Sequence, residues 1–120
     1  GTGKDRNDND LNSVWLLKMN GSALSITKAG SSSFFSGTGN SLFLYDDKIY
    51  LLSKREFYTS STWGITWEEV SEKQTLPTTL KNYVEQTVIV KNNRLWILGG
   101  KDSSGNSASG IWTGGLNRLK

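Results

Sequence analysis

The most concentrated polar chemistry in the chain lies in the loop of residues 99–112, GGKDSSGNSASGIW. Lys101 offers a cation, while Asp102 and Asn106 offer oxygen atoms, so this loop is a candidate binding segment. A phosphate-binding loop requires Gly-x-x-x-x-Gly-Lys-Ser/Thr before a helix. Here Asp102 follows the lysine, and Leu95 stands where the first glycine is needed. The sequence therefore excludes that kind of phosphate site.

Oxygen-bearing side chains also alternate near the N-terminus. In KDRNDND, residues 4–10, the alternate positions are Asp5, Asn7 and Asn9, as at the start of a calcium-binding loop. An EF-hand also needs glycine at its sixth position and glutamate at its twelfth, and the loop that begins at Asp102 has serine and threonine there. Asp, Asn and Ser dominate ordinary turns as well. A solvated turn is the favoured interpretation, and calcium binding by the N-terminal set is the alternative.

Composition removes several catalytic mechanisms. The chain has no histidine and no cysteine, which excludes Ser-His-Asp, Cys-His and zinc chemistry within it. Glycoside hydrolysis needs two carboxyl groups about 5–10 Å apart across a cleft. Glu68 and Glu69 are neighbours in an expected strand and so point to opposite faces. We expect no catalytic residue and no cofactor in this chain.

Charge and hydropathy limit the partners. The net charge is +3, but the basic residues are scattered and form no stripe of the kind that nucleic-acid binding needs. No apolar run reaches the roughly 18 residues of a membrane-spanning helix. We therefore expect neither a nucleic acid nor a membrane span.

The chain repeats itself at three offsets. Residues 3–20 align without a gap with residues 100–117, with six identical positions at an offset of 97. DKIYLLS (47–53) matches NRLWILG (93–99), and residues 15–24 match residues 58–67. A unit of about 45–50 residues built from short strands is typical of propeller blades. One small sheet cannot bury both of its faces, so it stacks on its neighbours.

The repeats divide the tryptophans into two groups. Trp63 falls in an expected turn, where the first unit has Asn20, and is the best single candidate for a ligand or partner contact. Structural roles are expected for the residues at repeated or strand positions, which are Trp15, Trp67, Trp96, Trp112, Gly99 and Gly100.

The expected fold is all-β, with antiparallel propeller blades. We expect strands at 14–17, 24–27, 41–45, 48–53, 57–60, 66–70, 85–90, 94–98 and 111–113, and hairpin turns at Asn20-Gly21, Asp46-Asp47, 62–65 and Asn92-Asn93. This makes about two and a quarter blades: residues 1–30 give the last two strands of one blade, 38–74 a complete blade, and 78–120 the first three strands of another.

Closed propellers typically have about 4–8 blades. We therefore expect a segment of a larger chain, or copies that assemble. We also expect the isolated chain to associate or aggregate, because open blade edges are templates for pairing.

The pattern resembles the kelch-repeat propellers. RLWILGG (94–100), a polar loop and GIW (110–112) match the family's apolar strand with its double glycine, its loop and its next aromatic strand. Trp67 and Leu76-Pro77 look like the family's fourth-strand tryptophan and inter-blade link. The second repeat departs from the pattern, with Ser53-Lys54 in place of the glycines, and the first keeps only GTG (1–3) and Trp15.

Two further resemblances concern shorter segments. SSTWGITW (60–67) resembles the Asp-box, Ser-x-Asp-x-Gly-x-Thr-Trp, with Thr62 in place of the aspartate. In the families that carry it, this box is a folding element of the hairpin. IWTGGLNRL (111–119) is similar to the C-terminus of an uncharacterised group of secreted, kelch-like propellers of gut bacteria. That likeness implies a periplasmic, cell-surface or extracellular location in a bacterium.

Two functional hypotheses follow. The first is a non-catalytic module of a larger propeller that binds a protein or a glycan, with the rest of the propeller or other copies of the chain as further partners. The second is a fragment of a sialidase-like or galactose-oxidase-like enzyme whose active site lies elsewhere. A galactose-oxidase-like copper site needs His and Cys, which are absent. A sialidase-like site needs a cluster of arginines, whereas the arginines of this chain are scattered. The first hypothesis is favoured.

Overall fold

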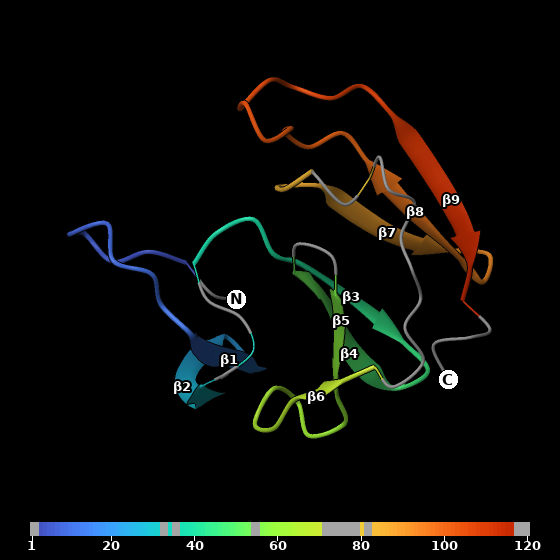
Figure 1. Ribbon diagram of the computed structural model, residues 1–120. Helices are drawn as coiled ribbons and strands as arrows, with labels where there is room; N and C mark the ends of the chain where they lie inside the picture. The colour runs from blue at the N-terminus through green and yellow to red at the C-terminus, as the bar shows by residue number, and fades with distance from the viewer. Residues whose placement is uncertain are drawn as a thin grey trace.

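The chain folds into antiparallel β-sheets (Figure 1). The structure, a computed structural model, describes residues 3–31, 34, 37–53, 56–70, 80 and 83–116. Its strands are β1 (Ser13–Asn20), β2 (Ala23–Ser31), β3 (Ser41–Tyr45), β4 (Lys48–Ser53), β5 (Glu56–Ser60), β6 (Glu68–Glu69), β7 (Thr87–Lys91), β8 (Arg94–Leu98) and β9 (Ile111–Gly115). In this part of the chain no helix is long and apolar enough to cross a bilayer.

Three sheets follow one another along the chain. The first pairs β1 with β2, the second has the order β3-β4-β5-β6, and the third has the order β7-β8-β9. Figure 1 shows them side by side in chain order, with the four-stranded sheet between the other two. The all-β prediction is confirmed, and sheets of two to four antiparallel strands are consistent with partial propeller blades. The blade limits 1–30, 38–74 and 78–120 stay predictions.

The repeat at an offset of 46 residues corresponds to two tight hairpins. Asp46 and Asp47 have φ angles of 52° and 57°, and Asn92 and Asn93 have 53° and 57°. Two central residues with positive φ define a type I′ turn, whose twist matches that of the flanking strands. Asp and Asn tolerate this left-handed conformation better than other side chains do. The strands on both sides, residues 41–45 and 94–98, therefore have the predicted bounds.

The first hairpin turns one residue later than predicted. Asn20 pairs with Ala23, so the two central residues are Gly21 and Ser22 rather than Asn20 and Gly21. Gly21 has a φ of 64°, and a glycine at the first central position is what a type II′ turn requires. The flanking strands are also longer than predicted, because the ladder continues from Asn20 back to Ser13.

Two other strands are shorter than predicted. The strand expected to begin at residue 85 begins at Thr87, since Glu85 has a φ of 58° and cannot join a ladder in that conformation. The strand expected over residues 66–70 is reduced to Glu68–Glu69. Thr66 is outside it because its backbone N–H bonds the Thr62 hydroxyl of the preceding turn instead.

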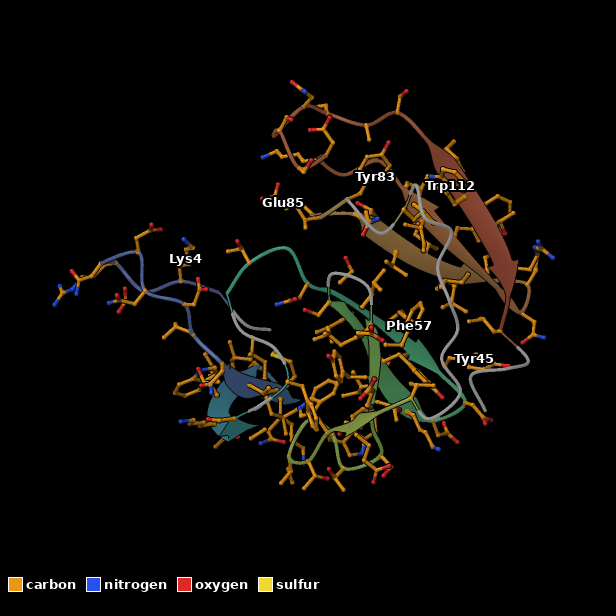
Figure 2. All side chains as sticks on the ribbon, viewed as in Figure 1. Lys4, Tyr45, Phe57, Tyr83, Glu85 and Trp112 are labelled. Atoms are coloured by element: carbon orange, nitrogen blue, oxygen red, sulfur yellow. The ribbon has the colours of Figure 1, made fainter. Side chains whose placement is uncertain are left out.

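The four-stranded sheet buries side chains on both faces. Side chains alternate along β4, so Tyr50 and Leu51 point in opposite directions, and each is only 1% exposed. The Tyr50 face packs against the third sheet, and Figure 2 shows Phe57 and Trp112 in the region between them. The main cluster comprises Phe43, Tyr50, Leu52, Phe57, Leu80, Leu95, Ile97 and Leu116. On the other face, Leu51 and Trp67 pack with Val14 of β1.

The outer sheets leave apolar side chains in solvent. On the two-stranded sheet these are Trp15, Leu16, Leu17, Met19, Leu24 and Ile26, and on the third sheet they are Ile89 and Ile111. In stacked blades such faces are covered by the next blade. The expected association of the isolated chain stays a prediction.

Contacts between the second and third sheets fix their relative direction. The Ser41 hydroxyl, at the start of β3, donates to the carbonyl of Gln86, just before β7. At the far end of the same strands, the Tyr45 hydroxyl donates to Asn93 Oδ1 at 2.9 Å. β3 and β7 therefore run side by side in one direction, which places the turns at 46–47 and 92–93 at the same end of the molecule.

We expect Gly100→Ala to destabilise the fold more than Gly105→Ala. Both glycines have positive φ, 101° and 81°, so an alanine costs about 1–2 kcal/mol of backbone strain at either position. A Cβ at Gly100 would also lie 2.7 Å from the Val84 carbonyl oxygen and 2.8 Å from Gln86 Cγ, whereas Gly105 has nothing within 4 Å. Denaturant unfolding of both variants is the measurement, and equal losses would contradict the close-approach role of Gly100.

Candidate functional site

The turn between β5 and β6, residues 61–67, is held by side-chain hydrogen bonds. Ser60 Oγ is buried and accepts from the backbone N–H groups of Thr62, at 3.3 Å, and Gly64, at 2.9 Å. Thr62 Oγ1 accepts from the Thr66 N–H at 2.9 Å and lies 2.7 Å from the Thr66 hydroxyl. The buried Trp67 indole donates to the Gly64 carbonyl at 3.1 Å. This network fixes the backbone of the turn.

The first hairpin supports the turn from the side. A Cβ at Gly64 would lie 2.8 Å from Val14 Cγ1, and a Cβ at Gly30 would lie 2.8 Å from the Ile65 carbonyl oxygen. Only glycine permits this close approach. The turn therefore packs directly on β1 and β2, which restricts its movement further.

The tip of the turn presents two apolar side chains to solvent. Trp63 is 64% exposed and Ile65 is 58% exposed. Trp63 also has a φ of 56°, an outlier for so bulky a residue that costs about 1–2 kcal/mol. The surrounding hydrogen bonds hold the tryptophan in this strained position.

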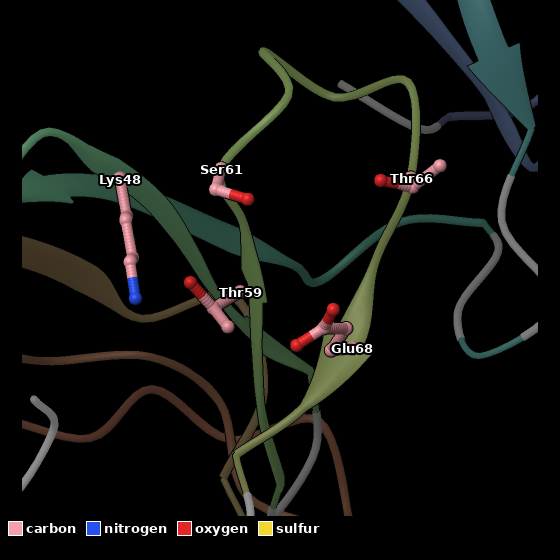
Figure 3. Close-up of a pocket in the computed structure, with 5 residues that line it drawn as sticks. All are labelled: Lys48, Thr59, Ser61, Thr66 and Glu68. Atoms are coloured by element: carbon pink, nitrogen blue, oxygen red, sulfur yellow. The ribbon is translucent and has the colours of Figure 1, made fainter.

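A small polar pocket lies beside the turn. It is lined by Lys48, Thr59, Ser61, Thr66 and Glu68 (Figure 3). Figure 3 shows the oxygens of Ser61, Thr66 and Glu68 directed toward the space that these residues share.

The register of the sheet explains how the pocket is assembled. Tyr50 pairs with Thr59, and Thr59 pairs with Glu68. Lys48 precedes Tyr50 by two positions, so all four side chains belong to one face of the sheet. Burial raises the pKa of Tyr50, and a hydrogen bond with the Thr59 side chain acts in the opposite direction.

Three groups of the pocket have no partner among the residues that the structure describes. Within that part of the chain, Lys48, Ser61 and Glu68 make no side-chain hydrogen bond or ion pair. An ammonium and a carboxylate of opposite charge thus line one small pocket without neutralising each other. Both are available to a ligand.

The N-terminal polar loop is closed by one carboxylate. Asp5 Oδ1 accepts from the backbone N–H groups of Asn7, at 2.8 Å, and Asn9, at 2.9 Å. Its Oδ2 accepts from Asn9 Nδ2 at 2.9 Å. Hydrogen bonds from Asn9 and Asn7 hold the pKa of Asp5 below its usual range. Both carboxylate oxygens face N–H donors, so a calcium ion would have to displace these hydrogen bonds.

The loop after β8 has the same geometry at an offset of 97 residues. Asp102 Oδ1 accepts from the Ser104 and Asn106 N–H groups, each at 2.9 Å, and Oδ2 accepts from Asn106 Nδ2 at 3.3 Å. These bonds, led by the Asn106 N–H, lower the pKa of Asp102. The sequence repeat is therefore a structural repeat, and Asp102 and Asn106 shape the loop.

The aligned lysines of the two loops have different partners. Lys4 lies 3.0 Å from Asp8 within its own loop. Lys101 lies 2.9 Å from Glu85, the residue with a positive φ before β7, which is labelled in Figure 2. Lys101 thus ties its loop to the preceding connection, which reduces its freedom to contact a ligand.

The predicted binding residues fall at two opposite ends of the molecule. Lys101, Asp102 and Asn106 share one loop, which joins β8 to β9. Trp63 lies in a β5–β6 turn, at the same end as the turn at 46–47, because neighbouring strands are antiparallel. The loop at 101–106 belongs to the other end. The structure therefore does not bring these residues into one site.

The tryptophans for which a structural role is predicted differ in how deeply they are buried. Trp67 is buried and Trp112 packs against the main cluster, while Trp96 is half-buried on the opposite face of β8 from Leu95. Trp15 is 48% exposed and its indole donates to Ser13 Oγ at 3.2 Å. Trp15 is therefore more exposed than a role in packing predicts, because its sheet has only two strands in the described part of the chain.

The polar pocket is not predicted from the sequence. Glu68 is considered there only as a possible catalytic carboxylate, and Lys48, Thr59 and Ser61 are not among the candidate residues. Once the strands are registered, residues at matching positions on one face become visible as a group. That register comes from the hairpin geometry rather than from any local motif.

We expect Asn9→Ala to raise the pKa of Asp5 more than Asn106→Ala raises that of Asp102. The hydrogen bond from the Asn9 side chain lowers the pKa of Asp5 the most, whereas the pKa of Asp102 is lowered most by the backbone N–H of Asn106. In the folded protein both aspartates have a pKa below that of the unfolded chain. Their hydrogen bonds therefore stabilise the fold at a pH above the unfolded pKa, and this stabilisation is lost as the pH falls through the folded pKa. Carboxyl NMR titration measures this, and Asp5 in Asn106→Ala is the control. Equal shifts would contradict the assignment.

Comparison with known proteins gives a family without an activity. The DUF6242 beta propeller domain matches residues 1–120. No curated protein matches the chain. The three successive antiparallel sheets agree with a propeller. Because the match covers the whole chain, this protein belongs to the DUF6242 beta propeller family.

Proposed function

We propose that this chain is a non-catalytic interaction module, part of a larger propeller, which binds a protein or a glycan through the turn at residues 61–67. The single observation that carries the proposal is Trp63, which is 64% exposed and has a φ of 56° in a turn held by the side-chain hydrogen bonds of Ser60, Thr62 and Trp67. Strained, exposed aromatic residues on rigid turns are characteristic of contact surfaces.

The energetics of the turn support this role. An exposed tryptophan gains little from burial, and its backbone conformation costs free energy. Asn or Gly would satisfy the same turn at lower cost. A rigid aromatic side chain can repay that cost by burying its surface against a partner with little loss of conformational entropy.

We also propose that this turn is a degenerate Asp-box in a kelch-like blade. Ser60, Thr62, Gly64, Thr66 and Trp67 occupy the motif positions, and their hydrogen bonds close the turn. Thr62 takes the place of the aspartate and supplies one acceptor where a carboxylate would supply two. Among the kelch-like features, Gly99 and Gly100 have positive φ. Three other positions lie outside the described residues: Lys54, the link at Leu76-Pro77 and the end at 117–120.

We expect Thr62→Asp to stabilise the protein by about 0.5–1.5 kcal/mol, because a carboxylate accepts stronger hydrogen bonds from the turn. Thr62→Val keeps the shape of the side chain but removes the acceptor, and should destabilise the protein by a similar amount. Denaturant unfolding of both variants is the measurement. A loss of stability in Thr62→Asp would contradict the Asp-box proposal.

The wider proposal includes partners and location. The rest of the propeller, or other copies of the chain, would cover the apolar faces that carry Leu17 and Ile111. The C-terminal likeness favours a periplasmic, cell-surface or extracellular setting in a bacterium. Turnover of a substrate that is abolished by a substitution within residues 1–120, in a variant that still folds, would overturn the non-catalytic part.

We expect Trp63→Asn to abolish partner binding while stabilising the fold by about 1 kcal/mol, since Asn tolerates positive φ. Trp63→Tyr, which keeps an aromatic ring, should retain most of the binding. A glycan array and an affinity capture with the full chain, combined with denaturant unfolding, measure both properties. Undiminished binding by Trp63→Asn to the partner so identified would overturn the proposal.

A further inference from the structure

We infer that the pocket lined by Lys48, Thr59, Ser61, Thr66 and Glu68 binds two neighbouring hydroxyl groups at the edge of a neutral sugar. This inference rests on the proposed function and deepens it, because it selects a glycan rather than a protein as the ligand of the turn. Ser61 and Thr66 belong to the same turn as Trp63.

The unpaired charges of the pocket determine the ligand chemistry. Glu68 accepts hydrogen bonds only, and Lys48 donates them only. Neither is paired with another side chain in the described part of the chain. A sugar hydroxyl donates and accepts at once, so one hydroxyl can donate to Glu68 while its neighbour accepts from Lys48. Charge-assisted hydrogen bonds of this kind are the stronger ones.

The same pair of charges disfavours other ligands. A phosphate or sulfate would meet the Glu68 carboxylate, and a metal ion or simple amine would meet the Lys48 ammonium. An apolar ligand would desolvate the Lys48 ammonium, the Glu68 carboxylate and the Ser61 hydroxyl without compensation. A free amino acid carries both charges and is the competing ligand that the experiment must separate from a sugar.

The pocket is preorganised for such a contact. Thr59 Oγ1 lies 3.3 Å from the Ile49 carbonyl on the neighbouring strand. The Thr66 hydroxyl and backbone are tied to Thr62 at 2.7 and 2.9 Å. Polar groups held in place lose little entropy on binding. Because the pocket is small, it takes only the edge of a sugar ring and leaves the rest of the ring outside, beside the turn that presents Trp63.

The test is an NMR titration of the full chain with glucose, galactose, mannose and their neutral trisaccharides, and with glycine as the competing ligand. We expect at least one of these sugars to shift the amide signals of Ser61, Thr66 and Glu68. Lys48→Met and Glu68→Ala should each weaken that binding about tenfold, the usual effect of losing one charge-assisted hydrogen bond. Glu69→Ala is the matched control, because Glu69 neighbours Glu68 and faces the other side of the sheet. It should bind as the wild type does.

Several outcomes would overturn the inference. These are the absence of shifts with every sugar, equal weakening in Glu69→Ala, and binding of glycine in place of sugars. Unfolding curves for each variant separate loss of binding from loss of fold. If Trp63→Asn loses its partner while Lys48→Met and Glu68→Ala keep theirs, the proposed function stands and this inference fails. If the sugar binds in Trp63→Asn with unchanged affinity, the pocket stands and the proposed role of Trp63 fails.

Discussion

The rest of the structure depends on one constraint, which is that the four-stranded sheet must bury both of its faces. Tyr50 and Leu51 are adjacent in β4, point in opposite directions and are both fully buried. Neither could be buried by one neighbour alone. The third sheet covers the first side and the β1–β2 hairpin packs on the second, so three sheets must stand in sequence. The hydrophobic effect thereby sets the stacked arrangement.

The same constraint makes a rigid turn available for recognition. Trp67 lies in the second cluster with Leu51 and anchors one end of the turn, and Ser60 at the end of β5 anchors the other. Between these anchors the backbone has no freedom to relax, and Trp63 can remain strained and exposed. The pocket beside the turn depends on the sheet as well, since strand pairing holds Thr59 and Glu68 together. Buried packing and the candidate site are therefore two consequences of one assembly.

Local turn chemistry explains where prediction from sequence succeeded. The type I′ turns at Asp46-Asp47 and Asn92-Asn93 fix the register of their hairpins, so the strand at 41–45 was predicted with the right bounds. Prediction failed where a backbone angle depends on distant contacts. Glu85 adopts a positive φ next to Lys101, with which it pairs, and no local pattern indicates that conformation. β6 begins later than predicted because the Thr66 backbone N–H, which a longer strand would have used, donates to the Thr62 hydroxyl instead.

By itself, the sequence determined the internal repeats and the loops that they encode. Asp5 and Asp102 close their loops with the same hydrogen bonds, because the aspartate and the asparagine that it bonds are present at equal spacing in both copies. It also placed Trp63 in a turn, which implied exposure. Only the tertiary structure decided which residues share a site. Antiparallel pairing sends Trp63 and Lys101 to opposite ends of the molecule. Strand register joins Lys48 and Glu68, which are 20 residues apart in the sequence, in a single pocket. Such contacts depend on how strands pair, and turn geometry and burial of the sheet together fix that pairing.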